Sequence, residues 1–219
     1  MGNANGVGRN TRVLMRIPRG ARPGANQVPT PHRLIIGISG ASGIIYGVRT
    51  LELLQDSGIE THLVMSKSAE MTLAYESDLK PAALRAMAST HHAASDIGAS
   101  ISSGSYPTMG MLIAPCSIRT MSEIATGVTS SLLTRAADVV LKERRRLVLA
   151  IRETPLHVGH LRTMVQLAEM GAVVAPIVPA FYNRPQSVDD IVNQTVGRLL
   201  DLFGVDVGIV KRWKGAPVR

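Results

Sequence analysis

The chain has 219 residues, of which 45% are hydrophobic and 18% charged, and this fits one globular domain with a sizeable core. Residues 1–32 carry five arginines and no acidic residue, which leaves +3 of the formal charge of +8 for the rest. That balance and an aromatic content of 3% argue against nucleic-acid binding. A single cysteine excludes an intrachain disulfide, and no apolar run reaches the roughly 18–20 residues of a membrane-spanning helix. We therefore expect a cytoplasmic protein.

Residues 1–31 are rich in Gly, Asn, Arg and Pro and lack sustained periodicity, so we expect a flexible basic leader outside the fold. An organelle-targeting peptide and an upstream extension of the true start are alternatives. Residues 32–219 are predicted to form the folded domain, which ends in a C-terminal tail.

From Arg33 onward, short apolar runs alternate with amphipathic segments. In chain order we predict a strand over 34–38, a helix over 44–55, a strand over 61–65, helices near 69–75 and 81–92, a loop over 97–108, a strand over 110–114, helices over 117–126 and 130–145, a strand over 147–151, a helix over 157–170, a strand over 172–174 and a helix over 188–203. This alternation predicts an α/β fold with a doubly wound, mainly parallel sheet in three layers.

Ligands of such folds bind outside the carboxyl ends of the strands. The small residues of 37–43 would let backbone N–H groups approach a phosphate or a flavin ring at a helix N-terminus, although a plain tight turn would look the same. The spacing departs from the three-glycine dinucleotide pattern. Of two further strings, the first, 102–105, has hydroxyls and a glycine that could hold phosphate or flavin oxygens, although such a string is more often a plain loop. The second, 115–117, ends a predicted strand. We expect Cys116, in the second string, to be a buried structural thiol.

Charged residues recur near the predicted strand ends. Arg135, Asp138 and Lys142 share one helix face, where they form either a phosphate grip or a solvated surface. The pair 152–153 (Arg-Glu) follows a predicted strand, as a salt bridge or as an acid–base group with its cation. The pair of histidines at 157 and 160 makes a weak case for metal. No metal is expected.

Two residues near the C-terminus stand out. Arg198 shares a helix face with apolar residues, which favours a buried anion contact or a subunit interface over a side chain that reaches solvent. Trp213, the only tryptophan, lies in a basic tail as a surface anchor or a lid.

Seven motifs, in this order, resemble the flavin prenyltransferase (UbiX) family. They are GISGASGIIYGVR (37–49), VMSKSAE (64–70), SGSYPTMGM (103–111), APCS (114–117), LLTRAADVVLKERR (132–145), RETPLHVGHLR (152–162) and PAFYNRPQS (179–187). The chain departs from the usual pattern at Ser131, Arg146 and Asn183, where the family commonly has Asn, Pro and His.

The resemblance implies a flavodoxin-like or Rossmann-like domain, assembled as a dodecamer, that joins a dimethylallyl group from dimethylallyl phosphate to N5 and C6 of reduced FMN. The product, prenylated FMN, would serve UbiD-type decarboxylases, as in ubiquinone biosynthesis. The residues implied are Gly40, Ala41, Ser42, Ser66, Ser117, Arg135 and Arg152 for FMN; Lys142, Tyr182, Arg198 and Trp213 for the donor; and Ser42, Glu76, Lys142 and Glu153 for catalysis.

Two other functions stay open at the level of sequence. Related FMN enzymes oxidatively decarboxylate peptidyl-cysteine, but they carry a Pro-x-Met-Asn string where this chain has Pro-Ala-Phe-Tyr at 179–182. A non-catalytic flavin-carrier subunit is the other alternative, and the donor-site residues argue against it.

Overall fold

The structure is a computed structural model that describes Gly2 and residues 32–215. Within this range six parallel strands form one sheet in the order β3-β2-β1-β4-β5-β6. The strands are β1 (Arg33–Ile38), β2 (Glu60–Met65), β3 (Thr90–His92), β4 (Gly110–Cys116), β5 (Arg146–Ile151) and β6 (Val173–Val174). The predicted doubly wound α/β fold is confirmed, and the strand order reverses between β1 and β4. The predicted leader lies outside the described residues.

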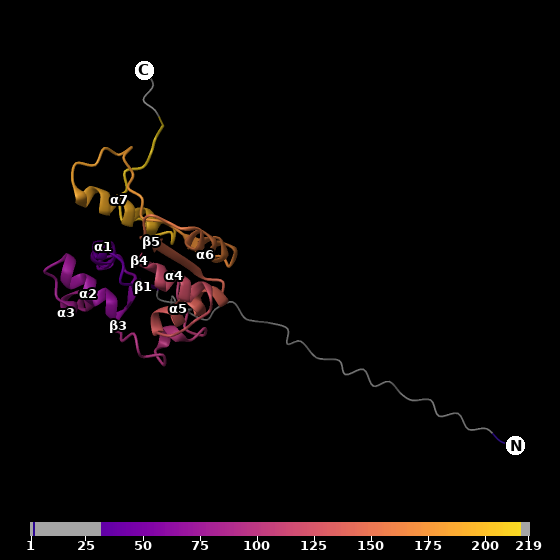
Figure 1. The fold of residues 1–219 in the computed structure, drawn as a ribbon. Helices are drawn as coiled ribbons and strands as arrows, with labels where there is room; N and C mark the ends of the chain where they lie inside the picture. Colours follow the sequence, from indigo (N-terminus) through magenta and orange to yellow (C-terminus); the bar gives the residue numbers. More distant parts are fainter. Residues whose placement is uncertain (1, 3–31, 216–219) are drawn as a thin grey trace. The chain divides into compact units, whose positions relative to one another are not determined.

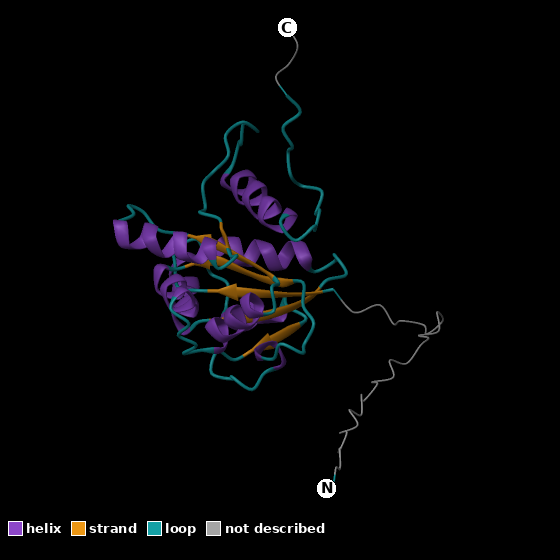
Figure 2. Cartoon of the chain, turned by 90° about the vertical axis from the view of Figure 1, so that its right-hand side faces the viewer, coloured by secondary structure: helices purple, strands orange, loops and turns teal. Residues whose placement is uncertain are grey.

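Helices cover both faces of the sheet (Figures 1 and 2). They are α1 (Ile44–Leu54), α2 (Lys67–Glu76), α3 (Pro81–Ala86), α4 (Ile118–Ala125), α5 (Leu132–Lys142), α6 (Val158–Glu169) and α7 (Val188–Asp201), with a short 3-10 turn at Ser100–Ser102. The inner strands are buried on both sides, as their continuous apolar runs predicted.

Alternate residues of β1, β2, β4 and β5 pack into two separate hydrophobic cores, one on each face of the sheet. On one face, residues such as Ile35, Met111 and Leu149 pack against α4, α5 and α6. On the other, residues such as Ile36, Leu112 and Val148 pack against α1 to α3 and α7. The two-residue period of a strand explains this division, and it leaves the strand ends free to carry the site.

Two predicted elements differ from the structure. The helix predicted over 81–92 ends at Ala86, and Thr90–His92 instead forms the edge strand β3. Pairing with β2, together with reciprocal hydrogen bonds between Thr61 and Ser89, outweighs the helical propensity of the alanines. The helix predicted over 130–145 is shorter, because Ser131 caps its start and Arg144 leaves helical geometry at its end.

None of the helices in the described residues is long and apolar enough to cross a membrane.

Candidate functional site

Four loops meet at the carboxyl edge of the sheet. Ser42, Ser66, Ser117 and Arg152 follow β1, β2, β4 and β5, which are neighbours in the sheet. The spacing of about 4.8 Å between strands brings these loops together along one edge. The structure thus gathers the residues predicted for FMN around the point where the strand order reverses, where doubly wound sheets bind their ligands.

A buried serine holds the two central strand ends together. The Ser39 hydroxyl donates to the Pro115 carbonyl at 2.9 Å and accepts from the Ser117 backbone N–H at 2.7 Å. The Ser39 backbone N–H donates to the same carbonyl at 3.2 Å. Ser39 therefore fixes the turn that carries Ser117.

Glu76, the last residue of α2, is hydrogen-bonded to the start of α1. Its carboxylate accepts hydrogen bonds from the Gly43 N–H at 2.9 Å and the Ile44 N–H at 2.9 Å. Partial burial raises the pKa of Glu76, but hydrogen bonds from Ser42, Ile44 and Gly43 and the charge of Arg152 outweigh it, so this pKa lies below its usual value. Ser42 and Arg152 thus favour the ionised form of the Glu76 carboxylate.

The other small residues of the edge are held closely. Ser66 and Ser117 accept hydrogen bonds from the backbone N–H groups of Ala69 and Thr120, and so cap α2 and α4. Gly40 lies against Ser68, leaving no room for a side chain, and its neighbour Ala41 is buried. The loop therefore needs its small residues for packing, whatever ligand it meets.

Arg135 lies in the first half of α5, which begins at the same edge of the sheet, since the Leu132 N–H donates to the Ala94 carbonyl beyond β3. Asp138 accepts from the Arg135 guanidinium at 2.8 Å. Asp138 therefore orients Arg135 rather than Lys142, whose Nζ donates to Glu143 at 2.5 Å.

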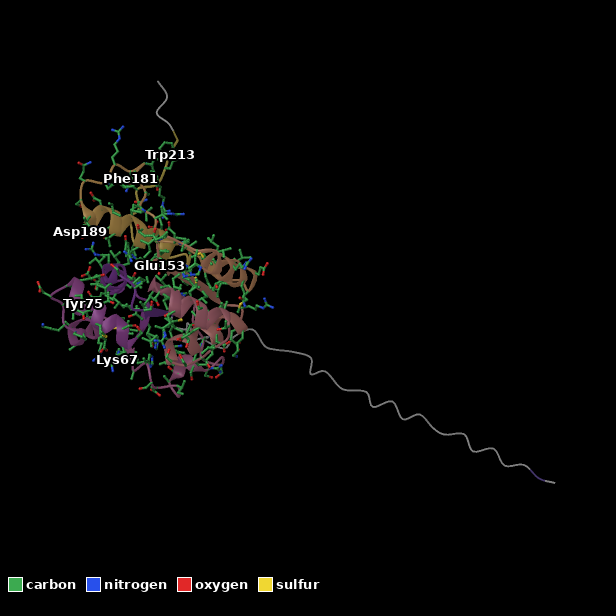
Figure 3. All side chains as sticks on the ribbon, in the orientation of Figure 1. Lys67, Tyr75, Glu153, Phe181, Asp189 and Trp213 are labelled. Atoms are coloured by element: carbon green, nitrogen blue, oxygen red, sulfur yellow. The ribbon has the colours of Figure 1, made fainter. Side chains whose placement is uncertain are left out.

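Three of the residues predicted for the donor line one cavity of about 590 Å³ beside α7. Its walls are Tyr182, Arg198, Val210, Arg212 and Trp213. The Tyr182 and Trp213 rings meet edge to face, with their centroids 6.0 Å apart. In Figure 3, the labelled residues Trp213 and Phe181 are both seen above α7.

Arg198 is not buried within the chain. It donates to Asp201 at 2.5 Å, and 55% of its side chain is exposed. The buried environment that its helix face suggested is therefore absent from the described residues of one chain, where this side of α7 is open.

Arg152 and Glu153 contribute to a second cavity, of about 510 Å³, whose far wall is the segment 176–179. Glu153 accepts from the Thr154 backbone N–H at 3.0 Å and is exposed. In Figure 3 it lies on the side of α7 that faces the rest of the domain.

Lys142 lies at the other end of the sheet. It ends α5 just before β5 begins, whereas Arg152 follows the end of β5. The six residues of that strand separate the two ends by roughly 20 Å. The 103–105 loop lies beside Lys142, because a Cβ on Gly104 would come within 2.7 Å of Lys142 Nζ. Lys142 and this loop are thus apart from the predicted residues at the carboxyl edge of the sheet.

The prediction that Cys116 is a buried structural thiol agrees with the structure. Cys116 is fully buried, and burial raises the pKa of its thiol. His157 accepts hydrogen bonds from the Gly159 and His160 N–H groups and so caps α6. The described residues contain no cluster of three or more His, Cys, Asp or Glu that could hold a metal ion.

Sequence reasoning missed two buried polar residues that hold the site together, Ser39 and Gln194. Ser39 lies inside the Gly-rich motif, directly after the apolar run of β1, so its position could have identified it. Gln194 lies in the middle of α7, on the side away from the core residues Val192 and Val196. The loop before α7 and the tail after it bury it there, and helix periodicity gave no signal for this.

Comparisons with known proteins agree with this geometry. The family model for "Flavoprotein" matches residues 25–200. The flavin prenyltransferase UbiX of Escherichia coli K12 is 61% identical over 187 residues, covering 84% of this chain and 99% of the relative.

Two solved structures share the fold over most of the chain. A crystal structure of AnUbiX (PadA1) in complex with FMN and dimethylallyl pyrophosphate has a TM-score of 0.83 at 47% identity, covering 84% of this chain and 98% of that one. A dodecameric, FMN-dependent UbiX-like decarboxylase from Escherichia coli O157:H7 has a TM-score of 0.82 at 46% identity, covering 84% and 100%. This chain belongs to the flavin prenyltransferase (UbiX) family of flavoproteins.

Proposed function

We propose that the protein is a flavin prenyltransferase that joins a dimethylallyl group from dimethylallyl phosphate to N5 and C6 of reduced FMN. The carrying observation is the Glu76 carboxylate, bonded to the Gly43 and Ile44 N–H groups beside Ser42 at the carboxyl edge, in a chain 61% identical to a curated enzyme of this name. In the reaction the donor C–O bond breaks and its electron pair leaves with the phosphate. Two bonds form to the flavin, at N5 and C6, and each of these atoms loses a proton. The double bond of the five-carbon unit takes up one proton at its central carbon as its outer carbon bonds to C6, so the net loss is one proton.

The residues at the carboxyl edge fit a flavin. Glu76 already accepts from the first two N–H groups at the start of α1, so a ligand beside Ser42 meets an ionised carboxylate instead of free N–H groups. A carboxylate suits a group that must lose protons and repels a phosphate. We therefore place the flavin ring beside Ser42 and Glu76, with Glu76 accepting protons through the Ser42 hydroxyl.

The cavity beside α7 fits the donor. Arg198 and the Tyr182 hydroxyl offer hydrogen bonds to a phosphate as its negative charge grows, and the Trp213 face stabilises positive charge on the five-carbon unit. Glu153, in the adjoining cavity, is a second candidate to steer protons.

The position of Lys142 implies a site shared between subunits. We propose that it reaches the donor phosphate bound by another subunit, since in its own chain α5 and the α7 helix of Arg198 lie on opposite faces of the sheet. Ser42, Glu76, Tyr182 and Trp213 are all exposed in the single chain, and a second subunit would shield them from water. The related Escherichia coli structure is dodecameric, and we propose the same assembly here.

An anaerobic assay tests the function. Purified protein mixed with reduced FMN and dimethylallyl phosphate should yield a flavin whose mass has increased by one five-carbon unit, detected by mass spectrometry. Unmodified FMN after prolonged incubation with folded, FMN-binding protein would contradict the proposal, and would leave the flavin-carrier alternative. The diphosphate donor should be assayed in parallel.

The recipient of the product stays a prediction. We propose a UbiD-type decarboxylase, tested by adding the reaction product to a purified decarboxylase apoprotein of that class and measuring release of CO₂. The cytoplasmic location expected from the sequence also stays a prediction.

A further inference from the structure

Gln194 is a buried amide that joins two separate segments to α7. It is 3% exposed. Its Nε2 donates to the Tyr182 hydroxyl oxygen at 2.9 Å and to the Lys211 carbonyl at 3.2 Å, while its Oε1 accepts from the Lys211 N–H at 2.9 Å. One side chain thus holds the loop before α7 and the tail after it, the two segments that carry Tyr182 and Trp213.

The neighbouring backbone leaves the Gln194 amide one orientation. A backbone N–H can only donate and a backbone carbonyl can only accept, so Oε1 must face the Lys211 N–H and Nε2 must face the Lys211 carbonyl. The same NH₂ group faces Tyr182, and toward that residue it can only donate.

This orientation constrains the Tyr182 hydroxyl. Because its oxygen accepts from Gln194, its own hydrogen is left to donate in another direction, and the cavity with Arg198 and Trp213 lies beside it. A hydroxyl that accepts one hydrogen bond is also polarised to donate a stronger one.

Two further contacts hold the tail against α7. A Cβ on Gly197 would come within 2.5 Å of Val210, so the tail packs directly on the helix at this glycine. Arg212 donates to both carboxylate oxygens of Asp201, at 2.8 and 2.9 Å. The tail is thus held to α7 at three successive residues, Val210, Lys211 and Arg212, and Trp213 follows directly.

We infer that Gln194 is a positioning residue for the donor site: it docks the tail that carries Trp213 and aims the Tyr182 hydroxyl hydrogen at the donor phosphate. The inference rests on the proposed function only for the identity of that phosphate. The docking of the tail is independent of it.

The test uses the full-length protein and three variants. Gln194→Glu keeps the size of the side chain and the acceptor for the Lys211 N–H, but it removes both N–H donors. The Tyr182 hydroxyl would then donate its hydrogen to the new carboxylate at position 194. Tyr182→Phe removes the hydroxyl and keeps the ring. Gln186→Glu adds the same charge at an exposed position on the same loop and is the matched control.

Three quantities are measured: the KM for dimethylallyl phosphate, the Kd for reduced FMN, and the emission of Trp213, which is the chain's only tryptophan. Gln194→Glu should raise the KM about tenfold or more, the effect of losing a hydrogen bond to a charged group, and should shift Trp213 emission to the red. Tyr182→Phe should raise the KM similarly with little change in emission. Both variants should keep the Kd for FMN within about twofold, as Gln186→Glu should keep all three quantities.

The double variant Gln194→Glu/Tyr182→Phe separates positioning from general damage. Its KM should be no higher than that of Gln194→Glu alone, because the two residues act through one hydroxyl. The inference would be overturned if the rise in KM of the double variant were the product of the two single rises. An unchanged KM and emission in Gln194→Glu would also overturn it. If Gln194→Glu does not fold, a wild-type KM in Tyr182→Phe would overturn it. A wild-type protein that makes no product would instead refute the proposed function, and Trp213 emission would still decide whether Gln194 docks the tail.

Discussion

Ser39 links β1 and β4 through one buried hydroxyl, which both donates and accepts. Replacing it by alanine leaves the Ser117 N–H without its acceptor, so Ser39→Ala should lower the free energy of unfolding by about 1–3 kcal/mol. The displaced Ser117 should also weaken FMN binding. Urea denaturation and FMN titration measure the two effects. Ser105→Ala, on an exposed loop, is the control, and equal losses in both variants would show that the bridge contributes nothing special.

Cys116 is buried and serves as a structural thiol. Because burial raises the pKa of its thiol, the thiolate is scarce at neutral pH and the sulfur is inaccessible. A thiol reagent such as dithiobis-nitrobenzoate should not react with the native protein, and should titrate one thiol after denaturation. Rapid reaction of the native protein would instead indicate a reactive cysteine.

Arg144, just after α5, has an unfavourable backbone conformation. Its φ of 56° lies in the left-handed region, where glycine is favoured, and the N–H groups of Arg144 and Arg145 donate to Leu141 and Val140 as in a Schellman cap. Arg144→Gly should therefore raise the free energy of unfolding by up to about 1 kcal/mol. Arg144→Ala removes the same charge but keeps the Cβ, and should change stability little. Equal thermal shifts in the two variants would rule out backbone strain as the cause.

The β2–β3 edge carries three histidines whose pKa values lie below the usual value. Burial lowers the pKa of His62, partly opposed by Glu60, and burial also lowers those of His91 and His92. The unfolded chain therefore binds protons that the folded edge does not.

Above about pH 6.5 these histidines should not lower the free energy of unfolding. As the pH falls below that value, they should lower it progressively. Denaturation at several pH values between about 5 and 8 measures this slope. His92→Asn should reduce the slope, whereas His32→Asn, at an exposed position, is the control. A slope identical in His92→Asn and wild type would contradict the assignment.

Periodicity alone predicted most of the fold, because buried parallel strands read as continuous apolar runs such as 34–38 and 147–151. It misassigned Thr90–His92, since an edge strand depends on a partner distant in sequence. Spacing placed Arg135, Asp138 and Lys142 on one helix face, but only the topology shows that Lys142 points to the opposite edge of the sheet from Arg152. The roles of the site residues rest on the family resemblance and stay predictions.

At the scale of the whole molecule, one chain presents an open cavity beside α7 and a separate cation, Lys142, at the end of α5. A closed oligomer resolves this separation if Lys142 of one subunit meets Arg198 of another. A purely intrachain site would need a rearrangement across the sheet, because α5 packs on one face of it and α7 on the other.

Subunit complementation tests this claim most directly. Lys142→Ala and Arg198→Ala should each be nearly inactive alone, while both bind FMN. After dissociation and random reassembly of an equal mixture, verified by native mass spectrometry, about a quarter of the sites should regain both side chains and form prenylated FMN. Mixed oligomers that remain as inactive as their parents would show that Lys142 and Arg198 do not serve one donor phosphate across a subunit boundary.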